Sequence, residues 1–184
     1  MGNLEIDILK EIIGLKEVWL YTSRMNIIWG KSVTVPDFSL KCGKTWIIID
    51  PIIEGFENSY IEWNRIEIQQ AHLADTPKDA DHVLIEGRHK VMKRALSSID
   101  FTGPYVVKSI EIYKFTVSNF ESESEIIEYD GCLVFNFDDG RSFAISSYQA
   151  PGGTLGFTMD KAEINQLTSF SSQRMLITED NRPT

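Results

Sequence analysis

The sequence of 184 residues has few of the residue types that most often build metal and cofactor sites. It contains two cysteines and three histidines. Cys42 and Cys132 fit neither a Cys-x-x-Cys pair nor the spacing of zinc ligands. No two histidines are four residues apart, and no His-Glu-x-x-His motif occurs. We therefore expect no cofactor and no metal, and two buried free thiols rather than a disulfide.

Long apolar stretches are also missing. The longest uninterrupted apolar runs, such as Trp46–Ile49, have four residues. A membrane-spanning helix needs roughly 20. The chain does not open on a basic segment followed by an apolar core, so we expect a cytoplasmic protein without a secretory signal. With 42% hydrophobic and 24% charged residues, the composition is globular. We expect one α+β domain over residues 1–178, followed by a disordered tail at 179–184.

Motifs for catalysis are absent as well. Gly43-Lys44-Thr45 would end a phosphate-binding loop, but that loop needs a glycine five positions before Gly43, where Phe38 stands. No Gly-x-Ser-x-Gly motif marks a nucleophile. The sequence therefore predicts a protein that is not an enzyme.

The acidic residues outnumber the basic ones, and most of the excess lies in the C-terminal third. Asp and Glu total 27 against 18 Lys and Arg, a net charge of −9. Residues 1–120 carry 16 acids and 14 bases, a net of −2, whereas residues 121–184 carry 11 and 4, a net of −7. Between Glu121 and Gly140 there is no base, and the seven acids are Glu121, Glu123, Glu125, Glu128, Asp130, Asp138 and Asp139.

This charge distribution argues against some partners and favours another. A surface rich in carboxylates repels phosphate backbones and anionic lipids, so nucleic acid and membranes are poor partners. It attracts a basic protein, and we take the seven acids as the candidate partner-binding residues. The alternative is that the acids only keep a β-rich protein in solution.

Short runs of β-branched and aromatic residues, separated by turn residues, predict a chain dominated by strands. The strand candidates are residues 18–21, 26–29, 46–49, 60–68 and 105–117. Pro36, Gly43, Pro51 and Gly55 are expected in turns, and the polar residues 71–81 in a surface loop.

Three segments carry helical patterns. Apolar residues recur at helical spacing over residues 3–13, and Gly14 follows as a terminator. Residues 88–98 offer one apolar and one basic face. Asp160, with Glu163 three positions on, predicts the start of a helix that ends near Leu167. The fold class is therefore α+β, mostly antiparallel β-sheet with two or three short helices.

Residues 126–147 give the clearest structural pattern. Two apolar runs flank Asp139-Gly140, a dipeptide favoured in the type I′ turn of a β-hairpin. The expected pairs are Asp138 with Arg141, Asn136 with Phe143, and Phe135 with Ala144. One face then carries Leu133, Phe135 and Phe137, and the other carries Cys132, Val134, Phe143 and Ile145. Because both faces are apolar, we expect the hairpin to be covered on two sides.

The segments Ile110–Tyr113, Glu128–Arg141 and Phe143–Ser146 together resemble a family of small acidic bacterial proteins, the immunity proteins of polymorphic toxin systems. The resemblance is confined to this part of the chain and carries over no functional residue. It implies a cytoplasmic protein that binds and blocks a toxin domain. Many such toxin domains cleave nucleic acid and are basic, so an acidic inhibitor would mimic the polyanion that they bind.

A second functional hypothesis comes from the aromatic residues. All four tryptophans, at positions 19, 29, 46 and 63, fall on strand candidates. They could line the cavity of a sandwich or barrel-like domain that binds a small ligand, or they could simply pack in the core.

Overall fold

The computed structural model describes residues 1–16, 18–22, 26–27, 32–35, 38–42, 45–57, 60–74, 80–85, 88–93, 97–100, 106–119, 125–148 and 153–181. Over these ranges the chain is mostly antiparallel sheet with two α-helices. The predicted fold class is confirmed at this level.

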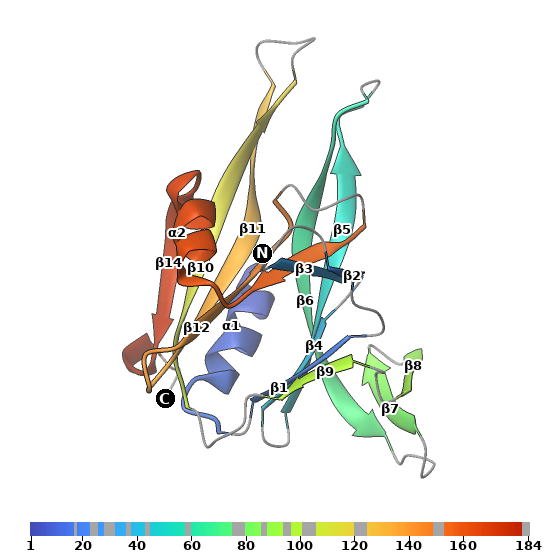
Figure 1. Ribbon diagram of the computed structural model, residues 1–184. Coiled ribbons are helices and arrows are strands. Elements are labelled where there is room, and N and C mark those ends of the chain that lie inside the picture. The colour runs from blue at the N-terminus through green and yellow to red at the C-terminus, as the bar shows by residue number, and fades with distance from the viewer. Residues whose placement is uncertain are drawn as a thin grey trace.

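The strands form two sheets of seven strands each (Figure 1). The first has the order β8-β7-β6-β5-β4-β1-β9, with β1 (Val18–Thr22), β4 (Phe38–Cys42), β5 (Thr45–Gly55), β6 (Glu62–Ala74), β7 (Ala80–Ile85), β8 (Arg88–Lys93) and β9 (Ser97–Asp100). The second has the order β14-β10-β11-β12-β13-β3-β2, with β2 (Asn26–Ile27), β3 (Ser32–Val35), β10 (Val107–Ser118), β11 (Ile126–Phe137), β12 (Ser142–Ser146), β13 (Leu155–Thr158) and β14 (Ser172–Thr178).

Helix α1 (Asn3–Ile12) lies between the two sheets (Figure 1). The buried residues of the helix share one core with Phe38 and Ile49 of the first sheet and Ile110 and Phe135 of the second. They are Ile6, Ile8, Leu9, Ile12 and Ile13. Gly14 follows with φ of 76°, a conformation that favours glycine and ends the helix as predicted. The apolar face of this segment therefore joins the sheets into one core.

Two turn and loop predictions in the first sheet are wrong. β5 continues through Pro51 to Gly55. Pro51 is tolerated because pairing with β4 stops at Ile49, which leaves β6 as its paired neighbour. The expected loop at 71–81 is mostly strand, since residues 71–74 end β6 and residues 80–81 begin β7. Residues 75–79 lie outside the described ranges.

The helix predicted over residues 88–98 is also wrong. Arg88–Lys93 forms β8 and pairs with β7, and Ser97–Asp100 forms β9 and pairs with β1. Periodicity over so short a segment does not separate helix from strand. The open edges of β7 and β1 supply backbone partners that an isolated helix would not use.

The β11–β12 hairpin forms, but its turn is not type I′. The Phe137 N–H donates to the Arg141 carbonyl at 2.9 Å and the Gly140 N–H to the Phe137 carbonyl at 3.2 Å. Gly140 has φ of 84°. The loop therefore has three residues, a type I turn closed by a left-handed glycine. The register shifts by one residue from the prediction.

The shift moves side chains to the opposite face of the sheet. Phe135 now opposes Phe143, with ring centroids 4.5 Å apart. Phe143 and Ile145 thus join Phe135 in the main core, and Ala144 joins the face of Cys132 and Val134. The prediction that both faces are apolar is confirmed.

Helix α2 (Lys161–Ser169) begins where predicted and ends two residues beyond Leu167. The Asp160 carboxylate accepts from the N–H groups of Ala162 and Glu163, at 3.0 and 3.2 Å. Glu163 accepts from the Thr158 hydroxyl at 2.8 Å instead of closing a capping box. β14 follows and was not predicted. Glu179–Asn181 is a 3-10 turn and not a disordered tail, and 182–184 lie outside the described ranges.

Among the glycines in the described ranges, Gly131 has the tightest surroundings, and its replacement gives a stability prediction. A Cβ here would lie 2.6 Å from Phe115 Cδ2 and 2.8 Å from Tyr129 Cε2. We expect Gly131→Ala to lower the free energy of unfolding by about 1–3 kcal/mol, because a packed core resists added atoms. Urea denaturation measures this. Gly156→Ala is the control, since its nearest atom is 3.4 Å away; equal stabilities of the two variants would contradict the packing described.

Candidate functional site

The hairpins β5–β6 and β10–β11 extend past their neighbours at one end of the molecule (Figure 1, top). β4 pairs with β5 only as far as Ile49, and neither β14 nor β12 reaches the end of the β10–β11 pair. The two hairpins meet through aromatic rings, with the centroids of Trp63 and Tyr129 6.4 Å apart. We call the described residues among 53–62 and 117–128 the two-hairpin end.

Large apolar side chains are exposed at the two-hairpin end. On β5–β6, Tyr60 is fully exposed and Ile53 is 52% exposed; on β11, Ile126 is 63% and Ile127 36% exposed. Burying such side chains is favourable, and a group of them on a protruding surface is typical of a contact site for another protein.

The same two hairpins also carry carboxylates. Glu54 pairs with Arg65 and Glu128 with Lys114, each at 2.9 Å. Exposed carboxylates that have no basic partner within the described part of the chain complete the set: Glu57, Glu62 and Glu125. The two-hairpin end therefore combines apolar contact area with uncompensated negative charge.

The seven acids predicted to bind a partner do not form one surface. Glu125 and Glu128 are exposed at the two-hairpin end. Asp138 and Asp139 are exposed just beyond the opposite end of β11, and Asp138 is ten positions after Glu128, roughly 30 Å at the usual rise of a strand. Glu121 and Glu123 lie outside the described residues.

The two turn aspartates have local partners. The Asp138 carboxylate accepts from the Val106 N–H at 3.2 Å. Asp139 pairs with Arg141, with Nε and Oδ2 2.6 Å apart, and accepts from the Arg141 N–H at 3.1 Å. Both side chains hold the hairpin turn in place.

Asp130 is not on the surface at all. Its side chain is 3% exposed and forms ion pairs with the Met1 amino group and with Arg174. β11 has its irregularity here, between the pairs that Tyr113 and Lys114 make. Its role is internal, so it is removed from the candidate partner-binding residues.

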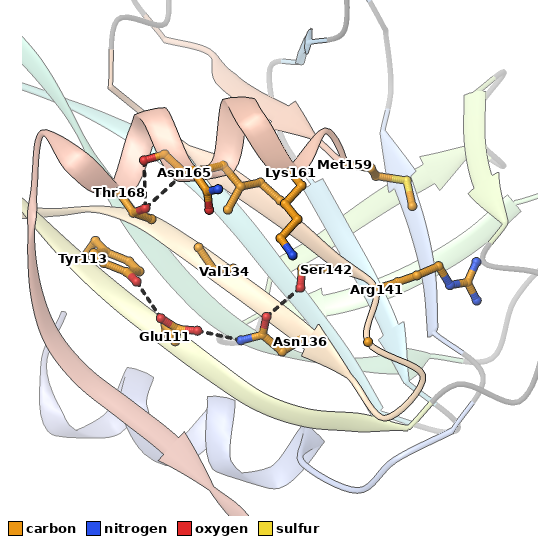
Figure 2. A pocket seen from close by; sticks show the side chains of 12 residues that line it. Glu111, Tyr113, Val134, Asn136, Arg141, Ser142, Met159, Lys161, Asn165 and Thr168 are labelled. Carbon is orange, nitrogen blue, oxygen red and sulfur yellow. Dashed lines mark hydrogen bonds between the residues drawn. The ribbon is translucent and has the colours of Figure 1, made fainter.

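A pocket lies between α2 and the face of β10, β11 and β12 (Figure 2). Its volume is about 570 Å³, within the range of small-molecule sites. A chain of hydrogen bonds crosses its floor: Tyr113 to Glu111 at 2.5 Å, Asn136 to Glu111 at 2.8 Å and Ser142 to Asn136 at 2.6 Å. Burial, and then the hydrogen bond to Glu111, raise the pKa of Tyr113, so its hydroxyl stays protonated and donates.

The tryptophans whose side chains are described do not line this pocket. Trp63 packs against Phe56, with ring centroids 5.0 Å apart, and Trp46 is buried with the Lys41 ammonium 5.5 Å from its ring centroid. Both serve packing. The side chains of Trp19 and Trp29 lie outside the described part.

Both thiols are free and buried, as predicted. Burial raises the pKa of Cys42 and of Cys132 to about 12, from an ordinary value near 9.0. At pH 8 roughly one thiol in ten thousand is then ionised. We expect neither cysteine to react with a disulfide reagent such as DTNB in the native protein, and both to react in denaturant. Rapid reaction of either native thiol would contradict this burial.

The same shifts predict how stability varies with pH. A raised pKa means that the folded protein keeps protons that the unfolded chain releases. The contribution of the two buried, protonated thiols to the free energy of unfolding is therefore fully present below about pH 9 and is lost as the pH rises towards 12. The midpoint of urea unfolding should fall across this range. The fall should be smaller in a Cys42→Ala, Cys132→Ala variant; an equal fall would show that the thiols do not contribute.

Neither helix in the described ranges is long and apolar enough to cross a membrane. Within the same ranges, no three His, Cys, Asp or Glu side chains come together in a way that could hold a metal ion. Comparison of the chain with protein-family models, curated proteins and solved structures gave no match.

Proposed function

We propose that this chain is a cytoplasmic binding protein of the immunity type, which neutralises a cationic toxin domain by docking its two-hairpin end onto that domain. One observation carries the proposal. Exposed apolar side chains, Ile53, Tyr60 and Ile126 among them, occur on the same two hairpins as exposed carboxylates that have no basic partner in the described chain.

The two kinds of group have separate tasks in this proposal. The apolar side chains supply the contact area that slows dissociation. The carboxylates of Glu57, Glu62 and Glu125 steer a basic partner to the surface and disfavour nucleic acid. Both sets lie on two hairpins that Trp63 and Tyr129 join, which gives them a pre-organised support.

Salt-dependent capture tests the proposal. The chain is immobilised and exposed to lysate of its source cell at low and at high salt, and each retained protein is identified and purified. We expect a basic protein that binds directly, more weakly at high salt, and not to a Tyr60→Ser, Ile126→Ser variant, whose substitutions are at exposed positions. Direct binding that this variant retains in full would place the interface elsewhere and contradict the proposal.

A further inference from the structure

The pocket beneath α2 plays no part in the docking proposal. On its floor, the side-chain hydrogen-bond donors of Tyr113, Asn136 and Ser142 are all engaged in bonds within the chain. The Tyr113 hydroxyl donates to Glu111. The two amide hydrogens of Asn136 go to Glu111 at 2.8 Å and to Ser109 at 3.2 Å. The Ser142 hydroxyl donates to Asn136 at 2.6 Å. Each of these donors is therefore occupied inside the chain.

The acceptors of the same groups are not exhausted. A carboxylate has about four lone-pair sites, an amide oxygen has two, and a hydroxyl oxygen has two. The Glu111 carboxylate, Asn136 Oδ1 and Ser142 Oγ each keep acceptor capacity after the bonds above. A ligand that satisfies this floor must donate hydrogen bonds to it, as hydroxyl groups do.

The side of the pocket formed by α2 has the opposite character. Lys161, in the first turn of the helix, directs its ammonium group toward Ser142 (Figure 2). Among the described residues it has no carboxylate partner. Val134 and Ile164 supply apolar walls between the floor and the helix. The ammonium therefore favours an anionic group on the ligand, held near Ser142 at one end of the acceptor floor.

We infer that this pocket binds a small carboxylic acid that carries hydroxyl groups, of the sugar-acid class. The carboxylate of the ligand pairs with Lys161, and its hydroxyl groups donate to Glu111, Asn136 and Ser142. The carbon skeleton lies against Val134 and Ile164. This site is separate from the two-hairpin end, so a test of ligand binding here does not depend on the docking proposal.

Three probes in calorimetric or NMR titration test the inference. D-glucuronate carries both features, D-glucose has the hydroxyl groups without the carboxylate, and adipate has carboxylates without hydroxyl groups. We expect glucuronate to bind at least about ten-fold more tightly than either of the others, a difference of about 1.4 kcal/mol. Its binding should shift the amide resonances of Asn136 and Ser142.

A pair of lysine variants tests whether Lys161 binds the carboxylate of the ligand. Lys161→Gln should lower the affinity for glucuronate to that for glucose, whereas Lys108→Gln, at an exposed lysine outside the pocket, should leave it unchanged. The inference is overturned if glucuronate fails to bind at millimolar concentrations, if adipate binds equally well, or if the two variants behave alike.

Discussion

Reversing the charge at Glu57, Glu62 and Glu125 together, to lysine, is expected to slow association with the captured basic partner by about ten-fold at low salt. The three carboxylates are exposed and lack a basic partner in the described chain, so their field reaches an approaching protein. Electrostatic steering acts mainly on the association rate and fades as salt rises. Stopped-flow kinetics at several salt concentrations measures the effect, and the difference from the wild type should shrink towards high salt.

The control applies the same change in net charge elsewhere. Asp7, Glu11 and Asp180 are exposed, and Asp7 pairs with Lys10 at 3.0 Å. They belong to α1 and to the C-terminal end, which lie away from the two-hairpin end (Figure 1), so their reversal to lysine should slow association far less. Equal slowing in the two triple variants would mean that net charge alone, and not the two-hairpin end, attracts the partner.

The second large effect is expected at Asp130. Asp130→Asn should lower the free energy of unfolding by about 3 kcal/mol, because the Arg174 guanidinium loses its buried counter-charge and the Met1 amino group keeps only the Glu5 carboxylate, 3.9 Å away. Urea denaturation followed by circular dichroism measures this. Association with the partner should keep the wild-type rate under conditions where the variant is folded, since Asp130 is 3% exposed.

Asp139→Asn is the matched comparison. Asp139 pairs with Arg141 at the surface, where the side chains of Asp139 and Arg141 are 34% and 40% exposed. Exposed ion pairs contribute about 0–1 kcal/mol to the free energy of unfolding. A loss of stability at Asp139 as large as that at Asp130 would refute the internal role that we assign to Asp130. A slowed association of folded Asp130→Asn would return Asp130 to the interface.

The sequence predicts the strand-rich α+β fold because its patterns are local. The apolar period of residues 3–13, Gly14 after them, and the Asp160 cap all act within a few residues of themselves. The β11–β12 hairpin is predicted for the same reason, but its register is not. Asp139-Gly140 is compatible with a two-residue and a three-residue loop, and only the pairing of Phe135 with Phe143 in the core selects the second.

The site was harder to predict because it depends on pairing between distant segments. Nothing near Glu57 or Glu62 in the sequence indicates that they lie at the same end of the molecule as Glu125. The Trp63–Tyr129 contact brings the two hairpins to the same end of the molecule. Asp130 appeared to belong with its acidic neighbours, but Met1 and Arg174, which lie 129 and 44 residues away, determine its environment.

The alternation of side chains along β11 does not predict the environment of Asp130 either. In a regular strand Asp130 would share a face with Cys132 and Val134. The irregularity of pairing between Tyr113 and Lys114 makes Gly131 an extra residue in β11, so the face changes there. The close approach of Phe115 and Tyr129 to Gly131 depends on this geometry, which no pattern of residues in the sequence predicts.

The most direct test of the proposed function is neutralisation in cells. The captured basic protein is expressed in a heterologous host alone, with the wild-type chain, and with the Glu57, Glu62 and Glu125 triple reversal. The proposal predicts that the partner alone stops growth, that the wild-type chain restores it, and that the triple variant restores it poorly at equal abundance. A role in immunity would be contradicted if the partner alone did not stop growth, or if the wild-type chain did not restore it.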